Sequence, residues 1–448
     1  MRRKLLCWPV LVLLPVLVAT GCLTTTAVPS PPERTGGTPR YPPPLAPDQP
    51  VTIRFESYLL AMAGPNRNAQ LRLLEEFSRR FPAITVETKA TPAGEIAASL
   101  RTQVAAGTPP DLAQAGLGDW DRVVESLGPV PLDQIVPPDE LAAHLGGAFP
   151  FHPRALALTR REEKLYGLAW NFSTPTLFFN ASLLREAGLD PDRPPRTWDE
   201  VKAMGLQVAQ HTGQPALYIA CLEWDWCAQA LLLSNGGQLL SPDRRQLRWT
   251  DPANLEVYRF WQELVRSGVH ARLRDAEAAE AFAAGKLAFY LQSSVYQATL
   301  IAASRDKWEL RSAAMPAFGS RPVRPTNSGA GLAIFATDPV RQRAAWELMK
   351  FLTSPEAYVI VTRDMGYLPL RTGIVNDERY LKGWPQLFLL QPNLQQLDHL
   401  EPWTSYPGDN SLQILSIFLK TQEAVVLQGA DPERSWREAQ ERAERLLP

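Results

Sequence analysis

Two short segments combine aromatic rings with a carboxylate, and these residue types suit the binding of sugars and polyols. They consist of Trp224, Asp225 and Trp226 in the first segment and of Trp403, Tyr406 and Asp409 in the second. The C–H faces of a sugar ring pack well on aromatic rings, and each hydroxyl that loses water on binding needs a hydrogen-bond partner. We therefore predict that both segments line a ligand-binding cleft.

The backbone conformation of the first segment decides how many of its side chains reach one ligand. In a strand, Trp224 and Trp226 share one face and Asp225 points away. In a loop, all three side chains can line a cleft. Both alternatives remain open, and in either we expect at least one tryptophan to stack on the ligand. Core packing accounts for most of the 13 tryptophans of the chain.

A protein with such a cleft could be a binding protein, and a secreted carbohydrate-active enzyme is the alternative. Such an enzyme needs two carboxylates on either side of the scissile bond, and acidic residues are plentiful here. However, the sequence contains no Gly-x-Ser-x-Gly, His-Glu-x-x-His or Walker motif, and its five histidines are widely separated. We therefore predict a binding protein that is not an enzyme and that needs neither a cofactor nor a metal ion.

The N-terminus carries the features of an export signal. Residues 2–4 are basic, an apolar run ends at Ala19, and small residues lead to Cys22. About 15 apolar residues are fewer than the roughly 20 that a membrane-spanning helix needs. We predict a signal peptide over residues 1–21 and lipidation of Cys22, as in bacterial lipoproteins, although Ala19 stands where leucine is usual. An ordinary cleaved signal is the alternative.

Residues 22–50 are rich in proline, which fixes φ and has no amide donor, so we expect an extended tether there. Cys221 and Cys227 follow much later, six residues apart. In an oxidising compartment a disulfide between them is possible. Without a nearby histidine, the pair does not indicate a zinc site.

Hydrophobic periodicity indicates an α/β fold. Residues 51–55 alternate as in a strand, residues 68–80 show helical spacing, and Ile84 and Val86 alternate again, which is typical of a βαβ unit with parallel strands. Asp338 and Ser354 each precede a proline and are predicted N-caps of two consecutive helices. The formal net charge is −1 and no basic run is present, so nucleic-acid binding is not expected.

Four sequence blocks carry a resemblance to a known family. The blocks are 166–198, 282–289, 328–332 and 366–369. In this order they resemble the bacterial extracellular solute-binding proteins of the sugar-binding type, which serve ABC importers, and most of all their glycerol-3-phosphate-binding members. The resemblance extends over nearly all of the chain from Val51 to Leu447.

The resemblance implies a two-lobed periplasmic-binding-protein fold of type II, with a cleft between the lobes and hinge crossings that allow closure. It implies a first lobe formed by residues 51–175 and 328–366. The second lobe would comprise residues 176–327 and 367–448. Such a receptor would be a monomer outside the cytoplasm, in the periplasm or on the outer face of the cell membrane, and would deliver its ligand to a permease heterodimer with its ATPase.

The resemblance also assigns ligand contacts at individual positions. It points to Ser173, Trp198, Ser293, Gly329 and Tyr367. Gly329 would offer a backbone amide that its missing side chain leaves accessible. Two of these residues have structural alternatives, because Trp198 could attach a helix to its lobe and Gly329 could serve a turn.

This sequence departs from the glycerol-3-phosphate-binding members at three places. Residues 408–418 contain no arginine for a phosphate, Leu117 replaces an acidic residue, and the tyrosine expected near Ala93 is missing. Arginine is the permanently charged, bidentate partner that a phosphate favours. We therefore predict a neutral mono- to trisaccharide, with glycerol 3-phosphate or a glycerophosphodiester as the alternative.

Overall fold

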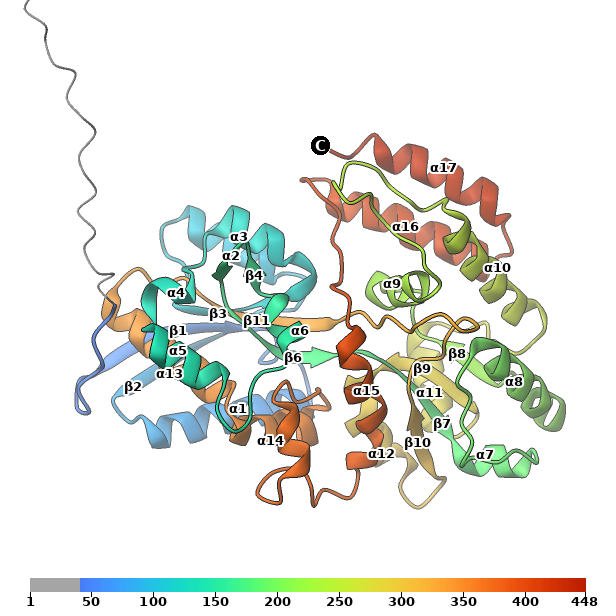
Figure 1. Ribbon diagram of the computed structural model, residues 1–448, viewed down its shortest axis with the longest axis horizontal. Coiled ribbons are helices and arrows are strands. Elements are labelled where there is room, and N and C mark those ends of the chain that lie inside the picture. The colour runs from blue at the N-terminus through green and yellow to red at the C-terminus, as the bar shows by residue number, and fades with distance from the viewer. Residues whose placement is uncertain (1–40) are drawn as a thin grey trace, which may run out of the picture. The chain divides into compact units, whose positions relative to one another are not determined.

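Two separate β-sheets organise the part of the chain that the computed structural model describes, residues 41–448 (Figure 1). The predicted signal peptide, Cys22 and most of the predicted tether lie outside the described residues. Each sheet has its own hydrophobic core. We call the two sheets with their cores the first lobe and the second lobe.

The sheet of the first lobe has the order β2-β1-β3-β11-β6. Its strands are β1 (Val51–Ser57), β2 (Ile84–Ala90), β3 (Leu112–Gly116), β6 (Leu168–Ser173) and β11 (Ser328–Ile334). Strand β1 pairs in parallel with β2 and β3, while β11 is antiparallel to β3 and β6. The predicted βαβ unit is therefore present, because α1 (Pro65–Arg80) connects β1 to β2.

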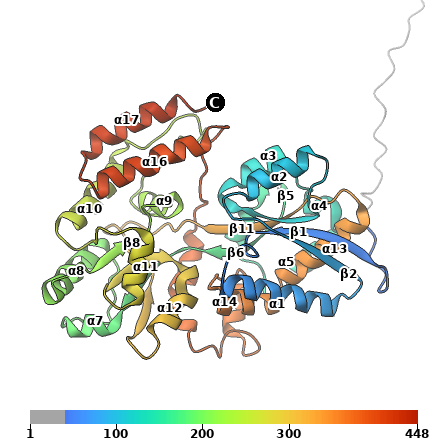
Figure 2. The same cartoon turned by 180° about the vertical axis from the view of Figure 1, so that it is seen from behind.

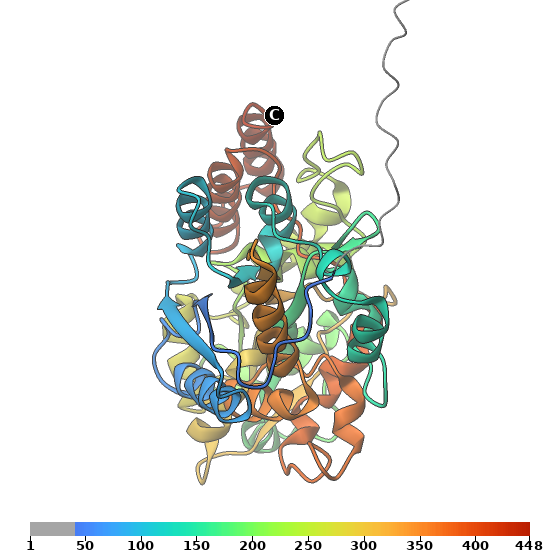
Figure 3. The same cartoon turned by 90° about the vertical axis from the view of Figure 1, so that its left-hand side faces the viewer.

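Helices cover both faces of this sheet. They are α1, α2 (Ile96–Ala105), η1 (Leu117–Asp119), α3 (Trp120–Leu127), α4 (Leu132–Ile135), α5 (Pro138–Leu145), α6 (Pro153–Ala157), α13 (Pro339–Leu352), α14 (Pro355–Met365) and η3 (Thr372–Asn376). Figures 1 and 2 show α2 and α3 on one face and α1 and α14 on the other, and the end-on view of Figure 3 shows the same separation. The predicted N-caps are confirmed, since Asp338 and Ser354 accept hydrogen bonds from the first turns of α13 and α14.

The sheet of the second lobe has the order β10-β7-β9-β8. Its strands are β7 (Pro175–Asn180), β8 (Leu217–Ile219), β9 (Phe289–Ser293) and β10 (Leu310–Ala313). The helices around it are α7 (Ala181–Glu186), α8 (Trp198–Thr212), α9 (Asp225–Ser234), α10 (Pro252–Arg266), α11 (Asp275–Ala283), η2 (Ser294–Tyr296), α12 (Gln297–Ser304), α16 (Ser411–Val426) and α17 (Pro432–Glu444). Helices α16 and α17 pack together and α10 packs on α16 (Figure 1).

The chain passes between the two sheets at three places. Strand β6 of the first sheet leads directly into β7 of the second through Thr174. The second passage is the segment before β11. A third segment runs beside it, because the Glu401 amide donates to the Pro325 carbonyl at 2.9 Å and Thr326 forms a bridge with Glu401.

The residues after α14 depart from the boundary that we expected at residue 366. Tyr367, Leu368, Leu370 and Ile374 are buried in the core of the first lobe, not the second. The cause is a direct backbone contact, in which the Leu368 amide donates to the Phe172 carbonyl of β6 at 2.8 Å. The chain then continues through η4 (Leu387–Leu389), α15 (Gln391–Gln396) and η5 (Leu397–His399), and α15 packs against β7 and β10.

A small ribbon of β4 (Arg160–Arg161) and β5 (Lys164–Leu165) projects from the first lobe ahead of β6. None of the helices between residues 41 and 448 has the length and apolarity needed to span a membrane.

Candidate ligand-binding site

The structure brings four of the predicted site residues together where the two sheets meet. We call Ser173, Ser293, Gly329 and Tyr367 the junction cluster. Ser173 ends β6 and Ser293 ends β9, and the Ser293 hydroxyl donates to the Ser173 Oγ at 2.9 Å. Both side chains are buried. A pair of hydroxyls, one from each lobe, therefore lies directly at the passage from one sheet to the other.

Gly329 is required by the backbone at its position. It lies in β11 opposite Phe172, and its φ of 111° belongs to a region that side chains rarely tolerate. A Cβ at this residue would overlap the Asn171 carbonyl oxygen. Gly329 therefore serves a close approach of two strands, and not the turn that we considered as its structural alternative.

Tyr367 belongs to a buried polar network in the first lobe. It lies beside Tyr58 and Asn171, and burial raises the pKa of its hydroxyl. The Asn171 amide donates to the Tyr58 hydroxyl, and the Gln114 amide donates to Asn171 Oδ1 at 2.7 Å. Tyr58, Asn171 and Gln114 were not predicted as site residues. Gln114 and Asn171 are single polar residues within the mostly apolar strands β3 and β6, and Tyr58 directly follows β1.

Asp225 and Trp226 lie at the beginning of α9, so this segment forms neither the strand nor the loop that we considered. Asp225 Oδ2 accepts hydrogen bonds from Gln229 Nε2 at 2.8 Å and from Trp403 Nε1 at 3.2 Å. Burial raises the pKa of this carboxyl to about 6, although the two hydrogen bonds act in the opposite direction. The two predicted aromatic-acid segments therefore do meet, through Asp225 and Trp403.

Trp224 and Trp226 have different surroundings. Trp226 is buried, and its carbonyl accepts a hydrogen bond from the Thr326 hydroxyl. Trp224 precedes the helix in an extended conformation and is 59% exposed. Of the two, only Trp224 offers an open aromatic face.

Three predicted residues lie neither in the junction cluster nor beside the Asp225–Trp403 contact. Trp198 is 1% exposed and packs on Phe260 and Phe318 at the start of α8, which agrees with its structural alternative. Tyr406 is buried against Trp249 and Phe418. Asp409 is exposed in the turn before α16. Apolar packing explains the first two positions, and nothing in the structure links Asp409 to a ligand.

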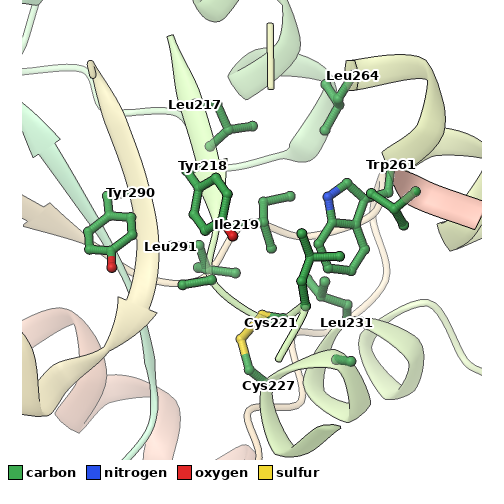
Figure 4. Close-up of a cluster of buried hydrophobic side chains, with 14 of the residues drawn as sticks. Leu217, Tyr218, Ile219, Cys221, Cys227, Leu231, Trp261, Leu264, Tyr290 and Leu291 are labelled. Atoms are coloured by element: carbon green, nitrogen blue, oxygen red, sulfur yellow. A yellow bond between two sulfur atoms is a disulfide. The ribbon is translucent and has the colours of Figure 1, made fainter. Parts of the chain in front are cut away.

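Cys221 and Cys227 form a disulfide that connects the end of β8 to α9. Figure 4 shows the bond beside Ile219 and Leu231, among the buried side chains of the second lobe. Because Cys227 lies in the first turn of α9, the disulfide holds the helix that carries Asp225 in place.

A pocket with a volume of about 80 Å³ lies between the lobes. It is lined by Leu117, Gly118, Asp121, Ala157, Leu158, Arg161, Arg244, Asn327, Pro402, Trp403 and Thr404. The ring of Trp403 lies so close to Gly118 that a Cβ there would overlap it. This volume has room for a few water molecules or for one polar group of a ligand.

Two arginines reach this pocket from separate segments. Arg161 comes from β4 of the first lobe and Arg244 from the loop after α9 of the second lobe, and both pair with Asp121 in α3. The distance from Arg244 Nη1 to Asp121 Oδ2 is 3.1 Å. The inference of a neutral ligand from the missing arginine in residues 408–418 is therefore weakened, because arginines from elsewhere in the chain occupy the pocket.

Asn327 connects the pocket to the junction cluster. It is 1% exposed and directly precedes Ser328 and Gly329, and its Oδ1 accepts a hydrogen bond from the Trp403 amide at 2.9 Å. Its Nδ2 has no hydrogen-bond partner among the described residues. Within residues 41–448, no cluster of three His, Cys, Asp or Glu side chains is placed to hold a metal ion.

The profile of the family of bacterial extracellular solute-binding proteins matches residues 66–359. The chain belongs to this family. The resemblance predicted from the four sequence blocks is thus confirmed.

Among curated relatives of this solute-binding protein, the arabinooligosaccharide-binding protein of Bacillus subtilis is 24% identical over 218 residues, which cover 48% of this chain and 44% of that protein. The sn-glycerol-3-phosphate-binding periplasmic protein of Pectobacterium atrosepticum is 25% identical over 216 residues, 45% of this chain and 48% of that protein. Each match therefore spans less than half the length of the relative.

Solved structures extend the similarity over most of the solute-binding protein. The cyclic α-maltosyl-1,6-maltose binding protein from Arthrobacter globiformis has a TM-score of 0.72 at 21% identity, covering 89% of this chain and 98% of the other. UgpB from Mycobacterium tuberculosis in complex with glycerophosphocholine has a TM-score of 0.72 at 24% identity, covering 88% and 98%. At these identities the similarity establishes the fold, and the predicted two-lobed α/β fold is confirmed.

Proposed function

We propose that this protein captures a small carbohydrate, a mono- to trisaccharide, between its two lobes for an ABC importer. The observation that carries the proposal is the position of the polar residues. Hydroxyls from both lobes meet at Ser173 and Ser293, and the pocket with Trp403 and Asn327 lies between the same two lobes. Hydroxyl, amide and indole groups between the two lobes match the needs of a dehydrated sugar.

Hinge closure is the proposed mechanism of capture. We propose that the lobes meet at residues 173–175, 325–328 and 401–403, with the third crossing displaced from residue 366 because Tyr367 and Leu368 pack in the first lobe. Contacts across the cleft support a closed state. Trp403 of the third crossing packs on Gly118 of the first lobe, and Arg244 of the second lobe pairs with Asp121 of the first. Closure of this kind presents a new surface to a membrane permease.

We further propose that the receptor works as a monomer outside the cytoplasm, held to the membrane by a lipid on Cys22, and that it delivers its ligand without chemical change. Its partners would be a permease heterodimer and the associated ATPase. A phosphate ester is the second candidate ligand, favoured by Arg161 and Arg244 in the pocket.

A thermal-shift screen of the purified full-length protein tests this function. The panel holds mono-, di- and trisaccharides, glycerol 3-phosphate and glycerophosphodiesters. A ligand at about 100 times its dissociation constant adds roughly 2.7 kcal/mol, which raises the melting temperature by several degrees. A response to saccharides supports the proposal, and a response to phosphate esters alone replaces the carbohydrate by the second candidate. A saccharide that is consumed during the assay, or no response to any compound, contradicts it.

A further inference from the structure

The charged groups that line the pocket do not balance. Arg161 and Arg244 contribute two guanidinium groups, and Asp121 is the carboxylate placed between them. Asp119 does not compensate the excess, because it pairs with Arg122 at 2.9 Å. Asp225 does not line the pocket. Because Arg161 and Arg244 share the single carboxylate of Asp121, the lining residues carry one more positive than negative charge.

Other donors accompany these guanidinium groups. The buried Asn327 lines the pocket, and its Nδ2 has no partner among the described residues, which is costly for a buried donor. On the first lobe, Leu117 and Gly118 of η1 and Asp121 of α3 also line the pocket. The guanidinium groups of the two lobes and the Asn327 amide therefore converge on this pocket.

We propose that this pocket receives a group on the ligand that carries a single negative charge, a carboxylate or a phosphodiester. The inference rests on the proposed function and narrows its ligand class from small carbohydrates in general to acidic ones, such as a uronate, or to glycerophosphodiesters. A single negative charge matches the single excess positive charge of the lining residues. A phosphate monoester carries about −1.5 to −2 at pH 7 and would exceed that match. Two guanidinium groups offer the bidentate geometry that both carboxylate and phosphodiester oxygens favour.

The main competing explanation is that Asp121 and Arg244 only hold the closed lobes together. Two substitutions separate these roles, since each breaks the Arg244–Asp121 ion pair and Asp121→Asn breaks the Arg161–Asp121 pair as well. Arg244→Gln removes one donor to the ligand, whereas Asp121→Asn removes the carboxylate that competes with the ligand for the arginines. A purely structural role predicts a loss of binding in both variants, at least as large in Asp121→Asn as in Arg244→Gln. Recognition of an anion predicts opposite effects.

Isothermal titration of the full-length protein with matched neutral and acidic ligands tests the proposal. The pairs are glucose with glucuronate and galactose with galacturonate, and glycerophosphocholine and glycerol 3-phosphate form the phosphate arm. We expect the acidic member of a pair to bind more tightly. We also expect Arg244→Gln to weaken its binding about tenfold or more, while Asp121→Asn binds it at least as tightly as the original protein. Raising the salt concentration should weaken acidic ligands more than neutral ones.

The outcomes of the titration separate this inference from the function on which it rests. Uronate binding identifies a carboxylate source, and glycerophosphocholine binding identifies a phosphodiester source. If neutral saccharides bind as tightly as their acidic partners, or if Asp121→Asn loses binding as Arg244→Gln does, the inference is overturned while the receptor function stands. If no compound binds, the proposed function itself fails.

Discussion

The junction cluster and the pocket between the lobes differ in the way they are constructed. Ser173, Ser293 and Gly329 lie in or at the ends of strands, where backbone contacts fix them. The pocket instead depends on long side chains from loops and short elements of both lobes, and Arg244 and Asp121 remain about one third exposed. In the proposed hinge closure, the junction would stay intact and the pocket would be assembled as the lobes close. Substitutions in the two regions should therefore affect stability and binding in different proportions.

The largest expected effect is at the junction. Gly329→Ala should lower the free energy of unfolding by roughly 3 kcal/mol or more, because a strained φ costs about 1–3 kcal/mol and the new Cβ also overlaps the Asn171 carbonyl. Urea denaturation measures this loss. Gly107→Ala is the matched control, since Gly107 has a φ of 70° but open space around it, and about 1 kcal/mol is expected there. Equal losses in the two variants would show that the close approach at the junction does not matter.

A second prediction concerns Asp225, which connects α9 to Trp403 beside the pocket. Its pKa is raised by burial to about 6 in the folded protein and lies near 3.9 in the unfolded chain. Between pH 4 and 6 the folded state therefore binds more protons, so stability should fall as the pH rises through this window. The full contribution is about 2–3 kcal/mol.

Asp225→Asn should remove this part of the pH dependence, because an amide oxygen can still accept from Gln229 and Trp403 but does not titrate. Urea denaturation at pH 4 and pH 7 compares the variant with the original protein. Burial also raises the pKa of Asp275 to about 6, so Asp275 contributes the same pH dependence of stability to both proteins. The difference between the two proteins isolates Asp225, and identical slopes would contradict the prediction.

A third prediction concerns the disulfide that holds the start of α9. It closes a short loop, since its cysteines are six residues apart, and removing it should cost about 2 kcal/mol of stability. The double variant Cys221→Ser with Cys227→Ser, or reduction under mild conditions, tests this by thermal unfolding. If the disulfide orients Asp225 and Trp403, ligand affinity should fall as well. Unchanged affinity with lower stability would confine its role to the core of the second lobe.

The smallest expected effect separates the half-buried Trp403 from the exposed Trp224. Trp403→Ala should weaken ligand binding by about 1–2 kcal/mol, because its ring lines the pocket and packs on Gly118. Trp224→Ala provides the comparison, since Trp224 is more exposed and does not line the pocket. Calorimetric titration gives both values. A larger loss for Trp224 would move the aromatic platform from the pocket to the residues before α9.

The sequence predicted the junction better than the pocket, for a physical reason. Ser173, Gly329 and Tyr367 belong to contiguous blocks whose order matches a known family, and strand alternation at residues 51–55 and 84–86 already indicated the first sheet. Arg161, Arg244 and Asp121 come from separate segments among 46 basic and 47 acidic residues, and linear spacing does not show which of them meet. Asn327 was within reach, because it directly precedes the block that begins at Ser328.

Aromatic residues predicted ligand contacts less well than the sequence blocks did. Trp198 and Tyr406 are of residue types that suit a sugar site, yet both are buried in the hydrophobic core of the second lobe. A large ring stabilises a core and a ligand site by the same burial of apolar surface, so its identity alone does not separate the two roles. The position of Trp198 at the start of a helix does not reveal its role in the sequence. Its packing on Phe318, which only the structure shows, does.

The central claim is that a small polar ligand is bound between the lobes, and calorimetric titration of the full-length protein and of two variants tests it most directly. The titrants are the neutral and acidic saccharides and the glycerophosphodiesters named above. We predict one-to-one binding that both Ser293→Ala at the junction and Trp403→Ala in the pocket weaken, with no consumption of the ligand. Binding that neither substitution changes would place the ligand elsewhere on the molecule and would contradict the account.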